Sequence, residues 1–314
     1  MRSDCQRLAV IAGVVVWCSA SAVAADSTPD SQSSPSGPAA EAQARLVQQR
    51  ELLKAGWQAY QAGQPREAIP FYQQALELTP STATLWYDLG CLHALNQDPA
   101  AARAALAQAL ALDPTLANAH DALGQLDEQS GDLPSAAAAF ERAHQLEPHK
   151  IQFLRHLARA NMNQSNEPAA RAALLQLVRY DPDDTDARYQ LGVLELRASA
   201  PDLAISDFQH AVARDPNHVL AWNGLGVAYT RTGKFDAARD AFRQARMLDP
   251  ASPRTQTNLG VWAAAQEHWE EARRAWELAL KTDPSFVPAQ KNLQTLDELL
   301  TIPPAHTTAT DLTQ

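Results

Sequence analysis

The chain has 314 residues, of which 46% are hydrophobic, and its 36 acidic against 26 basic side chains give a formal net charge of −10. An acidic surface of this kind repels nucleic acid and anionic lipid, so the composition argues against a nucleic-acid-binding function. Of the three cysteines, Cys5 and Cys18 lie near the N-terminus and Cys91 is alone in the rest of the chain. An intramolecular disulfide framework is therefore not expected.

The N-terminal segment, residues 1–24, has the pattern of a secretory signal peptide. Arg2 and Arg7 precede an apolar run at residues 8–17, and small residues follow up to residue 24. Cleavage is expected after residue 24, because this order of charged, apolar and small residues is typical of exported proteins. The apolar run is too short for a stable membrane span. We expect a periplasmic or secreted protein.

An alternative start is a lipidated cysteine. Cys18 would then be the first residue of an outer-membrane lipoprotein, but Trp17 stands before it, where such signals have a small residue. Residues 25–48 follow as a Ser/Pro-rich linker that leads into the first helix, and its composition predicts a flexible tether. Membrane attachment is expected only if Cys18 is lipidated.

The central part of the chain is a strict repeat. A proline recurs at one constant interval without insertion or deletion, at Pro80, Pro114, Pro148, Pro182, Pro216, Pro250 and Pro284. A period of this size is typical of stacked supersecondary units that depend on their neighbours for a hydrophobic core. We expect seven repeats over residues 49–286, which together present a long surface to another molecule.

Fixed positions within the repeat predict a helical hairpin. The eighth position is small, at Gly56, Gly90, Gly124, Ala158, Gly192, Gly226 and Gly260. The twenty-fourth position is large, at Tyr72, Leu106, Phe140, Leu174, Phe208, Phe242 and Trp276. Apolar residues recur three or four positions apart, as on one stripe of a helix. The small residues are expected where two helices cross, because they let the backbones approach while the large residue fills the adjacent space.

Helix ends can be predicted from the helix-breaking glycines and prolines. Gly63, Gly131 and Gly233 fall in the middle of their repeats, where glycine can end a helix. The periodic proline closes the second helix. Directly after that proline come residues that are expected to be N-caps of the next helix: Ser81, Thr115, Asp183, Asn217 and Ser285. Seven hairpins give fourteen helices and an all-α fold.

The chain is expected to end in a closing helix and a tail. Residues 287–301 have Leu293, Leu296, Leu299 and Leu300 on one side, and a repeat stack needs such a polar-backed cap helix. Residues 302–314 are rich in threonine and have no periodicity, so we expect a disordered tail.

The repeat resembles the tetratricopeptide repeat (TPR), whose 34-residue pattern combines Trp, Leu-Gly, Tyr, Ala, Phe, Ala and Pro. One repeat has all of these positions, in Trp222, Leu225, Gly226, Tyr229, Ala238, Phe242, Ala245 and Pro250. The resemblance extends in register over residues 49–286 and implies a right-handed α-solenoid of seven helix-turn-helix repeats plus the cap helix. It resembles the TPR proteins that bacteria export. The fourth repeat departs most, with Ala158 in place of glycine.

The resemblance also implies a binding surface. In the family, positions 2, 5, 6, 9, 12 and 13 of each first helix line a concave groove. On this chain the predicted groove residues are Tyr87, Arg155, Arg159, Tyr189, Arg197, Asn223, Arg231, Arg254, Asn258 and Lys291. Arginine forks and amides suit carboxylates and peptide backbone, so a partner with an acidic or carboxylate-bearing segment is expected. The alternative is that these are ordinary solvated side chains.

No catalytic, nucleotide-binding or metal-binding motif occurs in the sequence, and we expect neither an enzyme nor a cofactor or metal. The expected function is a protein–protein interaction scaffold of the cell envelope that binds a segment of a partner, for assembly of a pilus, a secretion system or a polysaccharide exporter. The alternative is a carbohydrate- or cell-wall-binding module, for which Trp57, Tyr60 and Tyr87 are the only indication.

Overall fold

Helices account for all the secondary structure of residues 38–301, the part of the chain that the computed structural model describes. The expected all-α class is therefore confirmed, with fifteen helices and no strand in this part. The predicted signal peptide, most of the linker and the tail lie outside the described residues. The chain divides after Ala173 into two compact units, which are described separately.

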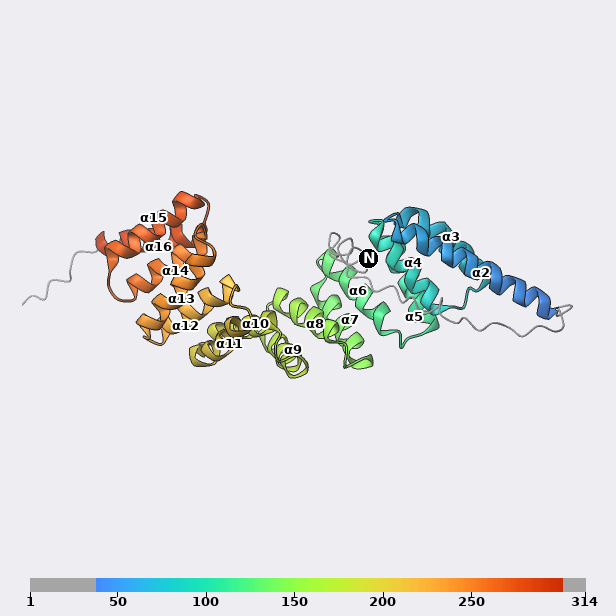
Figure 1. The fold of residues 1–314 in the computed structure, drawn as a ribbon, viewed down its shortest axis with the longest axis horizontal. Coiled ribbons are helices and arrows are strands. Elements are labelled where there is room, and N and C mark those ends of the chain that lie inside the picture. Colours follow the sequence, from blue (N-terminus) through green and yellow to red (C-terminus); the bar gives the residue numbers. More distant parts are fainter. Residues whose placement is uncertain (1–37, 302–314) are drawn as a thin grey trace, which may run out of the picture. The chain divides into compact units, whose positions relative to one another are not determined.

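In the N-terminal unit the helices follow one another in antiparallel pairs (Figure 1). They are α2 (Pro38–Gln61), α3 (Pro65–Leu78), α4 (Ala83–Leu95), α5 (Pro99–Leu112), α6 (Ala117–Ser130), α7 (Leu133–Leu146) and α8 (Ile151–Asn163). The next helix, α9 (Glu167–Tyr180), contains the division between the units. Each pair packs on the next, as α3 does on α4 and α7 on α8.

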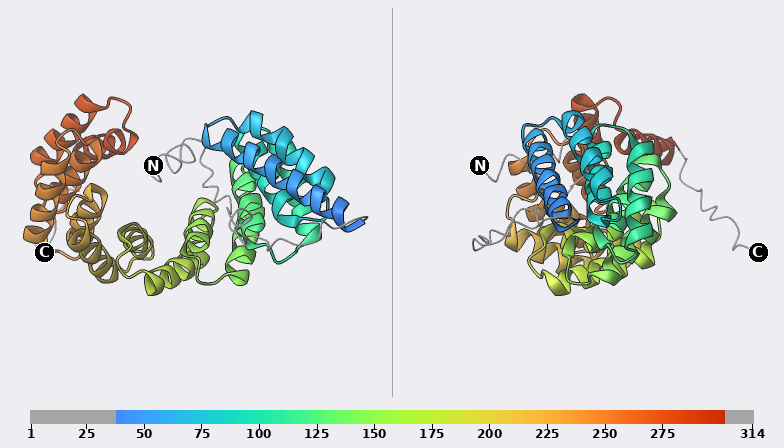
Figure 2. Two further views of the ribbon diagram at one scale, coloured as in Figure 1. Left: turned by 45° about the vertical axis from the view of Figure 1, so that its right-hand side comes forward. Right: turned by 90° about the vertical axis from the view of Figure 1, so that its right-hand side faces the viewer.

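The C-terminal unit repeats this arrangement (Figure 2). Its helices are α10 (Thr185–Arg197), α11 (Pro201–Arg214), α12 (Val219–Arg231), α13 (Phe235–Leu248), α14 (Pro253–Ala264), α15 (Trp269–Thr282) and α16 (Val287–Thr301). From α4 onward the first helices of successive repeats begin at the same interval as the periodic prolines, so the predicted hairpins of helix-turn-helix repeats are confirmed.

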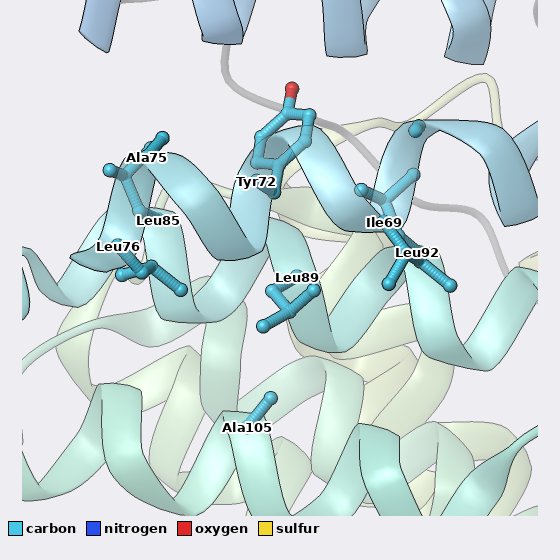
Figure 3. Close-up of a cluster of buried hydrophobic side chains, with 9 residues drawn as sticks. Ile69, Tyr72, Ala75, Leu76, Leu85, Leu89, Leu92 and Ala105 are labelled. Carbon is cyan, nitrogen blue, oxygen red and sulfur yellow. The ribbon is translucent and has the colours of Figure 1, made fainter. Parts of the chain in front are cut away.

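The core lies between the helices of neighbouring pairs. In the N-terminal unit, side chains of α3 meet those of α4 and α5 in one buried cluster (Figure 3). Ile69, Tyr72 and Leu76 come from α3, and Leu89 and Leu92 from α4. Burying a leucine or isoleucine side chain stabilises a fold by about 1.5–3 kcal/mol, so clusters of this kind hold successive repeats together.

The close crossing within each hairpin depends on the small residue at position 8, which is glycine in all repeats but the fourth, where it is Ala158. A Cβ atom added to Gly124 in α6 would lie 2.7 Å from the Phe140 ring of α7, and one added to Gly192 in α10 would lie 2.6 Å from the Phe208 ring of α11. Both rings are fully buried. The predicted pairing of a small with a large residue at the crossing is confirmed.

The turn inside each hairpin has a left-handed residue at position 15. Glycine occupies it three times, at Gly63, Gly131 and Gly233, with φ between 72° and 84°. Other residues adopt the same conformation in the remaining repeats, with φ between 58° and 63°, at Gln97, Ser165, Ser199 and Glu267. The next residue then donates its N–H to the carbonyl five residues back, as Ala200 does to Glu195 at 2.8 Å. This bond pattern closes a helix C-terminus.

Two local predictions differ from the structure. Helix α2 begins at Pro38, well before Gln49, where the first repeat was expected to start, because residues 39–53 are mostly strong helix formers. The predicted N-caps are wrong by one position. Thr82 and Asp184, for example, are the N-caps of α4 and α10, one residue after Ser81 and Asp183.

The residues after the periodic prolines instead close a turn. An aspartate just before the proline accepts a hydrogen bond from the N–H two residues further on, as Asp113 does from Thr115 at 2.9 Å. The same bond joins Asp215 to Asn217 at 3.0 Å. The Thr115 hydroxyl also donates to Asp113, and these bonds lower the pKa of the Asp113 carboxyl. Aspartate is favoured here because its side chain can imitate a backbone turn.

The glycine crossing can be tested with Gly124→Ala. Alanine is the better helix former by about 1 kcal/mol, so an unhindered site would gain stability. Here the added methyl group meets a fully buried ring, and overpacking costs about 1–3 kcal/mol. We expect a net loss of up to about 2 kcal/mol in the free energy of unfolding, measured by urea titration, in place of the gain of about 1 kcal/mol at an unhindered site. The control is the double variant with Phe140→Leu, in which the shorter side chain should make the same Gly124→Ala change less costly. An unchanged cost in that background would contradict the crossing contact.

Candidate functional site

The candidate site is the set of side chains at positions 2, 5, 6, 9, 12 and 13 of the first helix of each repeat, which is called here the first-helix face. These positions are three or four residues apart, so they share one side of a helix. In the described residues of the N-terminal unit the face belongs to α2, α4, α6 and α8, and in the C-terminal unit to α10, α12, α14 and the equivalent positions of α16.

The aromatic part of the face in the N-terminal unit is largely buried. Tyr87 is only 4% exposed and Cys91 only 1%, and both pack with Leu106 and Leu126 in a core cluster between α4, α5 and α6. Tyr87, a predicted groove residue, therefore contributes to the core. Trp57 and Tyr60 remain half-buried, with ring centroids 5.2 Å apart.

Acidic side chains of α6 engage the basic side chains of α8. The Arg159 guanidinium donates to both carboxylate oxygens of Glu128, at 3.0 and 2.6 Å. Nδ1 of His156 lies 2.7 Å from Asp121, which also accepts from the amide of Gln125 at 2.7 Å. The basic lining predicted for the fourth repeat is thus partly neutralised, although Arg155 is exposed on the same helix.

Amide side chains join α12 to α14 in the C-terminal unit. Asn223 is 2% exposed and donates to the hydroxyl of Thr255 at 2.9 Å, and Asn258 donates to the carbonyl oxygen of Asn223 at 3.3 Å. A buried amide needs such partners, because an unsatisfied polar group costs about 1–3 kcal/mol. Of these two predicted groove residues, Asn223 therefore serves the contact between repeats, and Asn258 is half-buried beside it.

Two further groove residues of this unit have partners within it. Tyr189 is half-buried, with its ring centroid 6.0 Å from that of Phe208 and 5.2 Å from that of His218. Arg231 is exposed and donates to the backbone carbonyl of Leu196 at 2.6 Å. That bond links α12 to α10 and fixes the guanidinium on the surface.

The remaining cations of the first-helix face are open to solvent. Arg197 in α10, Arg254 in α14 and Lys291 in α16 are all exposed. Within residues 38–301, Arg254 and Lys291 make no side-chain hydrogen bond or ion pair. Together with Arg231, they give each of the four first-helix-type helices of this unit one exposed basic side chain.

One unusual residue of the face was not predicted. Asp88, at position 6 of α4, is 8% exposed, and its Oδ1 has no hydrogen-bond partner among residues 38–301. Burial without a compensating charge raises the pKa of this carboxyl from 3.8 to about 7. Its place in the repeat pattern was the only signal in the sequence, because residue type alone would suggest a solvated acid.

Two other kinds of site were sought in residues 38–301. No three His, Cys, Asp or Glu side chains in that range are placed to hold a metal ion together. No helix in the same range has the length and apolar character needed to cross a membrane.

Family models decide the identity of the repeats. A model described as tetratricopeptide repeat matches residues 53–117 and 189–253, and a second model of the same description matches residues 127–192. The chain belongs to the tetratricopeptide repeat family. No curated protein matches it. TPR folds are scaffolds for protein–protein interactions, and this coarse function applies to the chain.

Solved structures agree on the fold. The C-terminal part of a TPR-containing protein from Cytophaga hutchinsonii has a TM-score of 0.61 at 13% identity, covering 77% of this chain and 99% of its own. A TPR protein from Parabacteroides merdae has a TM-score of 0.54 at 15% identity, covering 80% and 99%. YrrB, a TPR protein with an unusual peptide-binding site, has a TM-score of 0.50 at 21% identity, covering 60% and 97%. At these identities the likeness shows the TPR fold alone.

The pKa of Asp88 gives a test of its burial. The unfolded chain releases this proton near pH 4 and the folded chain near pH 7, so the carboxylate should destabilise the fold increasingly as the pH rises through that window. Asp88→Asn removes the charge. We expect the variant to exceed the parent in free energy of unfolding by roughly 1–4 kcal/mol at pH 8, and by clearly less at pH 5. Urea titrations at both pH values measure this difference.

The matched control is Asp240→Asn, which removes the charge of an exposed carboxylate on α13. That variant should differ from the parent in free energy of unfolding by the same amount at pH 5 and at pH 8. If Asp88→Asn gave the same difference from the parent at pH 5 and pH 8, the buried carboxyl would not be the group that titrates.

Proposed function

We propose that this TPR protein is an exported, non-enzymatic scaffold of the cell envelope that binds an acidic segment of a partner protein on its first-helix face. The supporting observation is the set of exposed cations Arg197, Arg231, Arg254 and Lys291 on four helices of one unit, two of them without any internal partner in the described part of the chain. The Arg254 guanidinium and the Lys291 ammonium, which have no side-chain partner within residues 38–301, favour a carboxylate from outside on this acidic protein.

The proposed partner is an extended peptide segment. Helices α14 and α16 both pack on α15, so their cations could contact one segment that runs across the end of the repeats. The peptide-binding site named for YrrB makes a peptide ligand reasonable for this fold, although that likeness does not identify the ligand. The envelope role, in assembly of a pilus, secretion system or polysaccharide exporter, rests on the signal-like residues 1–24 and stays part of the proposal.

A carbohydrate- or cell-wall-binding module is the second candidate. The half-buried pair of Trp57 and Tyr60 supports it, because an aromatic surface of this kind can stack on a sugar ring. Tyr87 no longer adds to that surface, since it is buried. The aromatic surface is therefore smaller than expected, and the peptide-binding proposal is favoured.

The charge requirement can be measured with the double variant Arg254→Glu and Lys291→Glu. The probes are capped decapeptides that contain four aspartates, and the same peptides with asparagine in their place. We expect binding of the aspartate peptides only, and an affinity about ten- to a hundredfold lower for the variant, because two contacts are lost and repulsion is added. Binding should also weaken as the salt concentration rises. Fluorescence anisotropy of labelled peptides reports both effects.

The control for net charge is Arg243→Glu with Arg246→Glu, on the second helix of the sixth repeat. Both side chains are exposed, so this variant has the same change of charge at another surface. Equal losses in the two double variants would mean that only overall charge matters. If the aspartate peptides bound the variant with Arg254→Glu and Lys291→Glu as tightly as the parent, the proposed face would be contradicted.

Export is tested by the N-terminus of the protein isolated from its native host. We expect the mature chain to begin at Ala25, because cleavage after residue 24 follows from the order of charged, apolar and small residues. Edman sequencing or mass spectrometry of the N-terminal peptide measures it. A start at a lipid-modified Cys18 would place the protein at a membrane surface instead, and an intact Met1 would contradict export by cleavage.

A further inference from the structure

The C-terminal unit contains a cavity between its last repeat and the cap helix. Its volume is about 250 Å³. Two helices and the cap line this open cavity, with Val261 and Ala264 from α14, Trp269 and Trp276 from α15, and Asn292, Thr295, Leu296 and Leu299 from α16. All of these belong to one unit, so the cavity is a property of that unit alone.

The volume limits what the cavity can hold. An apolar cavity of about 150 Å³ is known to take up benzene, whereas sites for drug-sized ligands or cofactors usually measure about 300–1,000 Å³. A cavity of about 250 Å³ therefore fits one large apolar side chain, such as leucine or phenylalanine, better than a whole cofactor.

The lining is apolar but has unused hydrogen-bonding groups. Trp276 is buried, and its indole N–H donates to the carbonyl of Thr257 at 3.0 Å. The indole N–H of Trp269 and the side-chain amide of Asn292 have no hydrogen-bond partner within residues 38–301. These groups can pair with the backbone of a peptide whose side chain enters the cavity.

A free cation stands next to the cavity on the same side of α16. Lys291, Thr295 and Leu299 are spaced four residues apart, so Lys291 lies one helical turn before Thr295, a rise of about 6 Å. Of the carboxylates of this helix, Asp297 pairs with Arg273 at 2.5 Å, and Glu298 accepts from the neutral amide of Gln294 at 2.9 Å and keeps its charge. Lys291 has no side-chain partner within residues 38–301, so its ammonium group is available to pair with a carboxylate of a bound peptide.

We propose that this cavity is the anchor pocket for a large apolar side chain of the partner, with an acidic residue about two or three positions away in the partner sequence contacting Lys291. The spacing follows from the rise of about 6–8 Å along the helix between Lys291 and the lining residues Thr295 and Leu296, because an extended peptide advances about 3.3 Å per residue. This inference rests on the proposed function, since it specifies where an acidic segment would be held and what else it contains.

The test uses capped peptides of the form Asp-Asp-Gly-X-Gly-Asp-Asp, with leucine, phenylalanine or alanine at X. This design places acids two and three positions from X in both directions. We expect the leucine and phenylalanine peptides to bind about tenfold or more tightly than the alanine peptide, because more apolar surface is buried. The indole N–H signal of Trp269 in a ¹H–¹⁵N spectrum, assigned with Trp269→Phe, should shift with the leucine peptide.

Two neighbouring leucines provide a matched pair of variants. Leu299 lines the cavity and is 50% exposed, whereas Leu300 is 55% exposed and does not line it. Leu299→Glu should weaken binding of the leucine peptide about tenfold, and Leu300→Glu should leave it unchanged. If Leu299→Glu does not fold, Ala264→Leu is the second variant, because it fills the cavity from α14 and should give the same loss.

The outcomes separate this inference from the proposed function. Peptides that bind equally with leucine or alanine at X, yet lose affinity with Arg254→Glu and Lys291→Glu, would overturn the pocket and keep the charged face. Absence of any peptide binding would overturn both. A Trp269 signal that shifts with protein concentration alone, or on removal of residues 302–314, would assign the pocket to a second copy or to the chain's own C-terminal segment and would also overturn the proposal.

Discussion

The contact on which the repeats depend is the crossing of two helices at a glycine. An aromatic ring or leucine from the second helix lies where a Cβ atom would be, as Phe208 does against Gly192. Phe208 also lies against Gly224 of the following repeat. One ring therefore contacts the first helix of its own hairpin and the first helix of the next, and limits how closely both can pack. Because the same pair of positions recurs in every repeat, a single local constraint is propagated along each unit.

Much of the fold follows from that period. The helical hairpins and the crossing could be predicted, because they are fixed by which residues are small, large or helix-breaking, whereas the start of α2 and the N-cap positions could not. The turn could be predicted only in part: Gly131 indicates a left-handed residue, but Gln97 and Ser199 adopt that conformation with side chains that do not reveal it. There the repeat context overrides the preference of the residue.

The candidate site was less predictable, because residue type does not say whether a polar side chain serves the fold or faces a partner. Arg159 and Asn223 occupy surface positions of the family pattern, yet both are used for contacts between repeats, with Glu128 and Thr255 respectively. Each partner belongs to a neighbouring repeat, so these contacts depend on how one repeat packs on the next. No reading of a single helix could have identified them.

The end of the array explains why an open cavity forms there. Inside a unit, each first helix packs against its own second helix and against the second helix of the preceding repeat, and polar side chains such as Asn258 join it to the neighbouring first helix. The cap helix α16 has no second helix of its own within the described residues, and Leu299 and Leu300 stay half-exposed on it. At the last helix of the stack, apolar surface that a following repeat would bury therefore stays exposed. A bound peptide could cover this surface as a following repeat would. The apolar side chains of α16 would then serve both to pack the end of the stack and to contact the partner.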